Sequence, residues 1–309
     1  MSDLILHHFD PSPFAEKIRL VFGLKQLSWK SVIIPMIMPK PMLTALTGGY
    51  RKTPVLQIGA DIYCDTNLIA EELEKRFPSP SLFPDGNSGL SLALGYWSNS
   101  AFFNPGAGLS MGINEELPEA ILKDRSEFFN FMDFSRLKEE LPHLYTQLLA
   151  HIDLVERQLA DGRPYLLGST PGWADIHAYF VIWMVRANVP PINDMLKTCL
   201  RMTGWEQRMA TIGHGERQDI EASAALAIAK TSVADVVEDV DSQDPLQLNT
   251  GDEVIVVPDD YGKVPVKGTL ISLNRQRLCI RRTSPETGEL NVHFPRAGFR
   301  ISAAQVSGL

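Results

Sequence analysis

The spacing of apolar residues changes twice along this chain of 309 residues, and these changes limit the folds that it can adopt. Short apolar runs alternate with helical spacing up to residue 77, helical spacing continues from about 90 to 230, and short β-branched runs follow. Strands and helices repeat their side-chain directions with different periods, so each change marks a new kind of structure. We therefore predict a multidomain chain: an α/β domain (1–80), an all-α domain (88–232), a linker (233–248) and a β module (249–309).

The first domain opens with a strand that leads directly into a helix, in the stretch HHFDPSPFAEKIRL. Ser12 followed by Pro13 is typical of a helix N-cap and a first helical residue, and Gly23 marks the helix end. Further along, TPVLQI, the turn GAD and IYC predict a hairpin, after which Thr66 is expected to cap another helix. This order of elements predicts a compact α/β unit.

The middle of the chain is predicted to be helical throughout. Leu144, Leu148, Ile152, Val155 and Leu159 form one apolar stripe. A buried helix is predicted to open at GWADIHAYF, with the glycine as N-cap and the aspartate at the third helical position. The glycine-rich FFNPGAGLSMG is interpreted as a break between helices, and GERQDIEASAALAIAK as the last helix.

The last sixty residues carry four or five short β-branched runs separated by turns, which predicts a small β-barrel. Its basic residues outnumber the nearby acids: they are Lys263, Lys267, Arg275, Arg277, Arg281, Arg282, Arg296 and Arg300. They could bind an anionic partner, or they could form a solvated face or contact the acidic remainder of the chain. The net charge of −8 argues against a general affinity for nucleic acid.

Composition and the N-terminal sequence also indicate the cellular compartment in which the protein is expected. The three cysteines have no paired spacing, so neither a disulfide framework nor a zinc site is indicated, and a reducing cytoplasm fits. The N-terminus lacks the apolar core of a signal peptide, and the longest apolar stretch is too short to span a bilayer. We therefore expect a cytoplasmic protein with no membrane partner.

Ser12 allows two interpretations. It can simply cap its helix, or its hydroxyl can also meet an anion, because a helix N-terminus directs backbone N–H groups and a partial positive charge toward negative groups. If the anion is a thiolate, a hydrogen bond to the charged form lowers the thiol pKa from its usual value near ~8.5. Each unit of pKa corresponds to about 1.4 kcal/mol of preference for the thiolate.

Three stretches resemble the glutathione transferase family: SPFAEKIRLVFGLKQLSWKSV, GGYRKTPVL and CDTNLIAEELEKRFP. The resemblance covers residues 4–80 well and extends more loosely to about 230, where PYLLGSTPGWADIHAYF is similar to the family's buried helix. It implies a thioredoxin-like fold for the first domain and an all-helical second domain. It says nothing of the β module.

The resemblance implies a site for glutathione. Ser12 matches the family's active-site serine or cysteine, and Thr53 matches the residue whose main chain pairs with the cysteinyl part of glutathione. Pro54 is then expected to follow a cis peptide bond. Phe9 stands where many members carry a tyrosine, so Ser12 would act without a nearby phenol.

The charged ends of glutathione receive partners from the same resemblance. Lys52, with Lys40 as a further candidate, matches the basic side chain near the glycine carboxylate. Asp65 and Thr66 match the acidic and hydroxyl pair that holds the γ-glutamyl end, although Glu-Ser is the commoner pair. A second substrate would lie near the sulfur, where five residues are candidates for an acceptor pocket, with core packing as their alternative role: Pro13, Trp97, Phe102, Phe103 and Met111.

These implications predict a glutathione transferase in which Ser12 assists attack of the glutathione thiolate on a small apolar electrophile, as in detoxification. Glutathione is a co-substrate, no metal or other cofactor is expected, and the family implies a homodimer. Two alternatives stay open. One is a non-catalytic binding protein whose β module recruits a partner; the other is a glutathione-dependent isomerase or dehalogenase.

Overall fold

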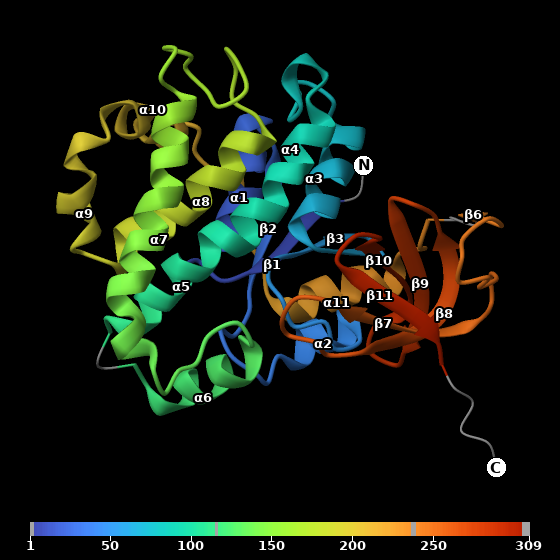
Figure 1. Ribbon diagram of the computed structural model, residues 1–309. Coiled ribbons are helices and arrows are strands. Elements are labelled where there is room, and N and C mark those ends of the chain that lie inside the picture. Colours follow the sequence, from blue (N-terminus) through green and yellow to red (C-terminus); the bar gives the residue numbers. More distant parts are fainter. Residues whose placement is uncertain (1–2, 115–116, 236–238, 305–309) are drawn as a thin grey trace. The chain divides into compact units, whose positions relative to one another are not determined.

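The computed structural model describes residues 3–114, 117–235 and 239–304 (Figure 1). The chain divides into two compact units. The first combines Met1–Ala15, Ser28–Glu71 and Glu216–Leu309, and the second combines Glu16–Leu27 and Glu72–Gly215. The two ends of the sequence therefore build one unit together, and the middle builds the other.

A mixed sheet runs through the first unit. Its strands are β1 (Leu4–His8), β2 (Ser28–Ile33), β3 (Val55–Ile58), β4 (Asp61–Cys64), β5 (Glu216–Asp219), β6 (Asp239–Val240), β7 (Glu253–Pro258), β8 (Val266–Leu273), β9 (Arg277–Ser284), β10 (Gly288–Pro295) and β11 (Phe299–Ala303). Hydrogen bonds join them in the order β11-β7-β8-β9-β10-β4-β3-β1-β2-β5, and β6 pairs with β8. β1 and β2 are parallel, whereas β3 is antiparallel to β1 and to β4. The α/β fold predicted near the N-terminus is confirmed.

The C-terminal strands extend this sheet. Their pairing does not close into the small β-barrel that the sequence predicted. β10 lies parallel to β4, with Asn291 opposite Asp61 and His293 opposite Tyr63. The strand order ends at β11, so the described strands form an open sheet. One buried hydrophobic cluster contains residues of both the N-terminal and the C-terminal strands. The physical reason is that the edge of β4 presents backbone N–H and C=O groups that a further strand can satisfy.

The seam between β4 and β10 holds a buried charged pair. His293 Nε2 and Asp61 Oδ1 lie 2.7 Å apart, and both side chains are less than 5% exposed. Asp61 also accepts a hydrogen bond from the backbone N–H of Asp235 at 2.9 Å. Tyr63 stacks on His293 with ring centroids 4.5 Å apart. Side-chain contacts therefore reinforce the backbone pairing between the two ends of the chain.

This pair is expected to make stability depend on pH in the alkaline range. Burial opposes protonation of His293, but the neighbouring Cys279 and Asp61 outweigh it and raise its pKa from 6.5 to about 9. A pKa raised on folding stabilises the folded state fully below the unfolded value, and this contribution is lost as pH rises through the folded value. The free energy of unfolding should therefore fall by roughly 2 to 3 kcal/mol between about pH 7 and about pH 10.

Denaturant unfolding of the wild type and of His293→Asn at these two pH values checks the prediction. The variant lacks the titrating group, so its free energy of unfolding should change less with pH than that of the wild type. An identical change in both proteins would assign the pH dependence to other groups.

Two helices lie wholly within the first unit, α2 (Pro41–Thr47) and α11 (Ala222–Thr231), and α11 contacts β10, α2 and β2. The segment before α11 differs from the prediction of one continuous helix. Its first residues, Glu216–Asp219, form β5, which pairs in parallel with Ser28–Ser31 of β2. All four β5 side chains are exposed, so the strand forms through backbone hydrogen bonds and shows no apolar periodicity in the sequence.

The second unit is helical, as predicted. Its helices are α4 (Ser88–Trp97), α5 (Phe103–Gly112), α6 (Glu119–Phe128), α7 (Leu137–Gln158), α8 (Trp173–Asn188), α9 (Ile192–Met195) and α10 (Leu200–Ala210), and α1 (Pro13–Leu24) and α3 (Thr66–Arg76) run from the first unit's segments into it. Short helical turns cover Pro84–Gly86, Ser98–Phe102 and Leu196–Thr198. Within the described parts of the chain, no helix combines the length and apolar character needed to cross a membrane.

The stretch FFNPGAGLSMG is helical, and its interpretation as a break was wrong. It forms α5, which contacts α7 and α8. A Cβ atom added at Gly106 would lie 3.0 Å from Met184 Cε, and one at Gly108 would lie 2.8 Å from Leu144 Cδ1. The glycines therefore permit close helix packing, and this tertiary contact outweighs their low helix propensity.

The buried helix α8 begins as predicted. Gly172 is its N-cap and donates its backbone N–H to Asp175 Oδ2 at 3.0 Å. Asp175 Oδ1 accepts two more hydrogen bonds at 2.8 Å, from the Leu166 N–H and the Trp205 indole N–H. The carboxylate is 1% exposed, so one buried side chain joins the loop before α8, the start of α8 and α10.

Candidate functional site

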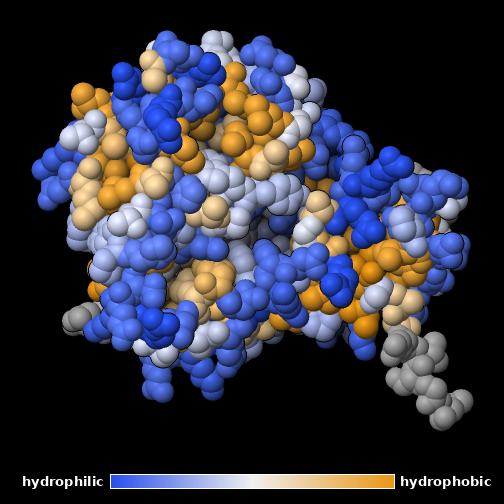
Figure 2. Space-filling view, viewed as in Figure 1, coloured by the Kyte–Doolittle hydropathy of each residue, from blue (hydrophilic) through white to orange (hydrophobic). Residues whose placement is uncertain are grey.

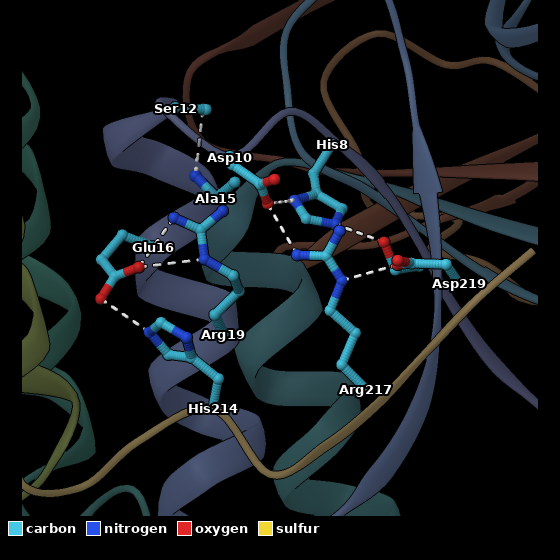
Figure 3. Close-up of polar contacts among 10 residues, drawn as sticks. His8, Asp10, Ser12, Ala15, Glu16, Arg19, His214, Arg217 and Asp219 are labelled. Atoms are coloured by element: carbon cyan, nitrogen blue, oxygen red, sulfur yellow. Dashed lines mark hydrogen bonds and ion pairs between the residues drawn. The ribbon is translucent and has the colours of Figure 1, made fainter.

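Ser12 lies at the junction of β1 and α1. Its backbone N–H donates to the Phe9 carbonyl at 3.0 Å, and its Oγ accepts a hydrogen bond from the Ala15 N–H at 3.2 Å (Figure 3). The capping role predicted for Ser12 is therefore confirmed. The side chain is 3% exposed, and Oγ accepts with a lone pair, so its hydroxyl proton can be donated to another acceptor.

The strand register brings Ser12 to the same end of the sheet as two other predicted segments. His7, the last residue but one of β1, is opposite Val55 at the start of β3, and Val55 is opposite Cys64 at the end of β4. The residues after His7, before Val55 and after Cys64 therefore lie at the same end of these three strands. We refer to this end as the edge of the sheet that carries Ser12. α1 and α3 both begin at this edge, so two helix N-termini with their partial positive charge meet there.

Thr53 and Pro54 immediately precede β3 at this edge. The peptide bond between them is cis, as the family resemblance implied. Lys40 lies beside them: its Nζ donates to Thr53 Oγ1 and to the Arg51 carbonyl, each at 3.3 Å, and lies 5.6 Å from the centre of the Phe9 ring. Phe9, Lys40 and Thr53 are thus brought together in the first unit.

Asp65 caps α3, and the cap was predicted one residue too late, at Thr66. The Asp65 carbonyl accepts from the Ile69 N–H at 3.0 Å, and its Oδ1 accepts from the Asn67 N–H at 2.8 Å. Asp65 has φ of 81°, a conformation that aspartate tolerates better than most residues. Thr66 is the first helical residue and is 4% exposed, so both side chains lie at the start of α3.

Lys52 is paired with the C-terminal part of the chain. Its Nζ donates to Asp260 and lies 4.2 Å from the centre of the Tyr261 ring. Burial lowers the pKa of Lys52 below its usual 10.5, although Asp260 opposes this effect. Asp260 and Tyr261 were not expected here from the sequence, because their position depends on β10 pairing with β4, and no local pattern signals that pairing.

Figure 3 draws two groups of ion pairs, one in each unit. In the first unit, Arg217 on β5 binds Asp10 and Asp219, with a nitrogen–oxygen distance of 2.7 Å in each case. Asp10 lies two residues before Ser12, so its ion pair with Arg217 joins this loop to strand β5. In the second unit, Glu16 binds Arg19 at 2.7 Å and His214 at 2.9 Å.

The acceptor candidates of the second unit lie in its aromatic core. Phe102 and Phe103 are at most 3% exposed, and Phe102 stacks on Trp97 with ring centroids 5.0 Å apart. The Trp97 indole N–H donates to His151 Nδ1 at 3.1 Å. Met111 is half-buried on α5, and Pro13, in the first unit, is half-buried at the start of α1.

A cavity of about 440 Å³ lies within the second unit and was not expected from the sequence. Its walls come from α5, from α7 and from the segment before α7, and they combine apolar and titratable side chains. The lining residues are Ala101, Asn104, Pro105, Gly108, Phe131, Met132, Asp133, Arg136, Leu137, Glu140, His143, Leu144, Gln147 and His151. The glycine-rich stretch was the available signal, since Gly108 lines this cavity.

Three of the eight basic residues noted in the C-terminal part of the chain lie beside acids. Arg281, Arg296 and Arg300 lie within 3.9 Å of Glu289, Asp244 and Asp259 respectively. On the face shown in Figure 2, hydrophilic residues of these strands are interrupted by hydrophobic ones. This arrangement favours a solvated, locally neutralised surface over a continuous basic face.

The histidines of β1 have separate partners. His7 Nε2 lies 2.9 Å from Gln57 Oε1, and His8 Nε2 lies 3.0 Å from Ser31 Oγ. Burial lowers the pKa of His7 to about 4, although Gln57 opposes this, so His7 is neutral near pH 7. Across residues 3–114, 117–235 and 239–304, no cluster of three or more His, Cys, Asp or Glu side chains is placed to hold a metal ion.

Comparisons with known proteins point to one family. The family model described as Glutathione S-transferase, N-terminal domain matches residues 6–81, and the one described as Glutathione S-transferase, C-terminal domain matches residues 138–210. A crystal structure of a GST-like protein from Pseudomonas syringae is 36% identical, covers 98% of this chain and 100% of that chain, and superposes with a TM-score of 0.82.

More distant relatives match part of this chain. A glutathione S-transferase from Rhodospirillum rubrum is 21% identical, with 67% of this chain and 88% of that chain covered and a TM-score of 0.52. Glutathione S-transferase U4 from Arabidopsis thaliana is 24% identical over 133 residues, or 42% of this chain. That match spans 59% of the length of the Arabidopsis protein.

Proposed function

The chain belongs to the glutathione S-transferase family, and from this premise we propose that it binds glutathione at the sheet edge that carries Ser12 and activates its thiol there. The observation that carries this proposal is the position of Ser12: its buried hydroxyl caps α1 at the edge of the sheet where Thr53 and Asp65 also lie. A hydroxyl in that position can donate its proton to a thiolate while its lone pair caps the helix.

Each polar group of glutathione has a proposed partner at this edge. The cysteinyl main chain pairs with the main chain of Thr53. The γ-glutamyl carboxylate binds at the N-terminus of α3, beside Thr66. The γ-glutamyl ammonium takes Asp65, whose shorter reach than glutamate places this end closer to α3. The glycyl carboxylate faces Lys40 and Lys52.

The reaction proposed is attack of the glutathione thiolate on a small apolar electrophile. The sulfur lone pair forms a bond to carbon, and either a leaving group departs with its electron pair or the electrons of a polarised double bond are displaced and then protonated. The proposed acceleration of this reaction comes from stabilising the thiolate and from positioning it against the electrophile. Pro13, Trp97 and Met111 are the residues proposed near the acceptor, whereas Phe102 and Phe103, which are at most 3% exposed, take the core-packing role that was their alternative.

Calorimetric titration with glutathione and S-hexylglutathione tests binding, and turnover of aryl halides, unsaturated carbonyls and epoxides tests catalysis. We expect both ligands to bind, the hexyl derivative more tightly because its chain buries apolar surface. Absence of binding at millimolar ligand would reject the proposal. Binding without turnover of any electrophile would instead favour the non-catalytic alternative.

We also propose a cytoplasmic homodimer that acts in detoxification, as its family membership suggests. Sedimentation velocity across a range of protein concentrations tests the dimer. A monomer at all concentrations would reject this part of the proposal and leave the proposed glutathione site as it stands.

A further inference from the structure

The loop before β3 is covered by the C-terminal part of the chain, and this cover belongs to the first unit. The Tyr50 ring lies 5.8 Å from that of Phe294, and a Cβ atom on Gly49 would lie 3.4 Å from Val264 Cγ1. Gly48, with φ of 77°, lies directly against the guanidinium of Arg282. The segment that holds Lys52 and Thr53 is therefore packed against residues that lie more than 200 positions later.

Within this cover, Asp260 supplies a carboxylate to Lys52. The Lys52 side chain is 13% exposed and its Nζ donates to Asp260 Oδ1, while the Tyr261 ring lies 4.2 Å away on another side of the ammonium group. Tyr261 is 8% exposed, so the ring is a fixed part of the packing. Asp260 is 56% exposed at its side chain, which leaves its carboxylate accessible from solvent.

We propose that Asp260 determines specificity at the glycyl end of the glutathione site, by occupying Lys52 with a carboxylate of the protein itself. This inference rests on the proposed function, in which Lys52 faces the glycyl carboxylate. A ligand carboxylate must then displace Asp260 or approach an ammonium group whose charge is already matched. Thiols in which the glycyl carboxylate is uncharged, as an ester or an amide, avoid this competition. The wild-type site is therefore suited to glutathione derivatives extended through a neutral glycyl linkage.

The test compares one ligand pair in two proteins. S-hexylglutathione and its glycyl monoethyl ester differ at the glycyl end, where the ester is uncharged and carries an added ethyl group, and both are titrated calorimetrically into the wild type and Asp260→Asn. Lys40, the other proposed partner of the glycyl carboxylate, is the same in both proteins, so the measured quantity is the change in the ratio of the acid and ester dissociation constants when Asp260 is replaced. In Asp260→Asn the acid should bind about tenfold more tightly, with the ester unchanged.

Two further variants separate the specific pair from a general charge effect. Asp259→Asn removes the same charge one residue away, where the carboxylate lies 3.9 Å from Arg300, and it should leave the ratio of the two constants unchanged. Lys52→Met combined with Asp260→Asn should abolish the tenfold gain. Circular dichroism and thermal melting confirm that each protein is folded before titration.

The outcomes are distinct. An equal ratio in the wild type and in Asp260→Asn, with both ligands bound, overturns this inference and leaves the proposed function intact. The same gain in Asp259→Asn overturns it as well, because the effect would then come from net charge. Failure of both ligands to bind to any of the folded proteins overturns the proposed function itself, and this inference with it.

Discussion

Replacing Ser12 by alanine is expected to raise the pKa of the thiol of bound glutathione by about two units and to lower kcat/KM about 100-fold. The hydroxyl is the proposed donor to the thiolate, and Phe9 offers no phenol to replace it. Without this hydrogen bond the neutral thiol is favoured, so less of the bound ligand is ready to attack at neutral pH. Ultraviolet absorbance of the bound thiolate across a pH titration, with steady-state rates, measures both effects.

The same substitution also removes the helix cap. Loss of the bond from the Ala15 N–H should lower the free energy of unfolding by about 0.5 to 2 kcal/mol, so each assay needs a measured folded fraction. Ser12→Thr keeps both the hydroxyl and the cap and serves as the matched control; it should retain most of the pKa shift. An unchanged thiol pKa in Ser12→Ala, in a folded protein that still binds glutathione, would exclude the proposed role of Ser12.

Among the substitutions proposed for this protein, Asp175→Ala is expected to cause the largest loss of stability. The free energy of unfolding should fall by about 4 kcal/mol. The substitution removes a buried carboxylate and leaves three donors without their acceptor: the Leu166 and Gly172 N–H groups and the Trp205 indole N–H. Hydrogen bonds to charged groups contribute about 1.5 to 3 kcal/mol each, and partial relaxation reduces their sum. Denaturant unfolding followed by circular dichroism gives the value.

Two comparisons make the result for Asp175 interpretable. Asp175→Asn retains one oxygen acceptor and should lose about half as much stability as the alanine variant. Asp153→Asn alters an exposed carboxylate of α7 that lies 2.8 Å from Arg157, and it should change stability by less than about 1 kcal/mol. Similar losses in Asp175→Ala and Asp153→Asn would show that the three buried hydrogen bonds contribute little.

Local signals in the sequence were enough to predict several features. Ser12 and Pro13 mark the start of α1 because capping involves only adjacent residues, and Gly172 with Asp175 marks the start of α8 for the same reason. These features depend on a few neighbouring residues, so one stretch of sequence contains the information.

Features that depend on distant residues were missed. β5 consists of exposed polar residues and exists because β2 offers an edge, which no apolar pattern encodes. The helical state of FFNPGAGLSMG depends on the close approach of α7 and α8. Asp260 reaches Lys52 only because the C-terminal strands join the N-terminal sheet. In each case the deciding contact is formed by segments that are far apart along the chain.

The parallel pairing of β10 with β4 has a consequence for how the chain is made. A ribosome releases β4 more than 200 residues before β10, and until β10 arrives the outer edge of β4 has open backbone donors and acceptors. Such an edge can recruit a strand from another nascent chain. Completion of this sheet is therefore a late event of biosynthesis, and β10 protects the growing protein from self-association as well as forming part of its structure.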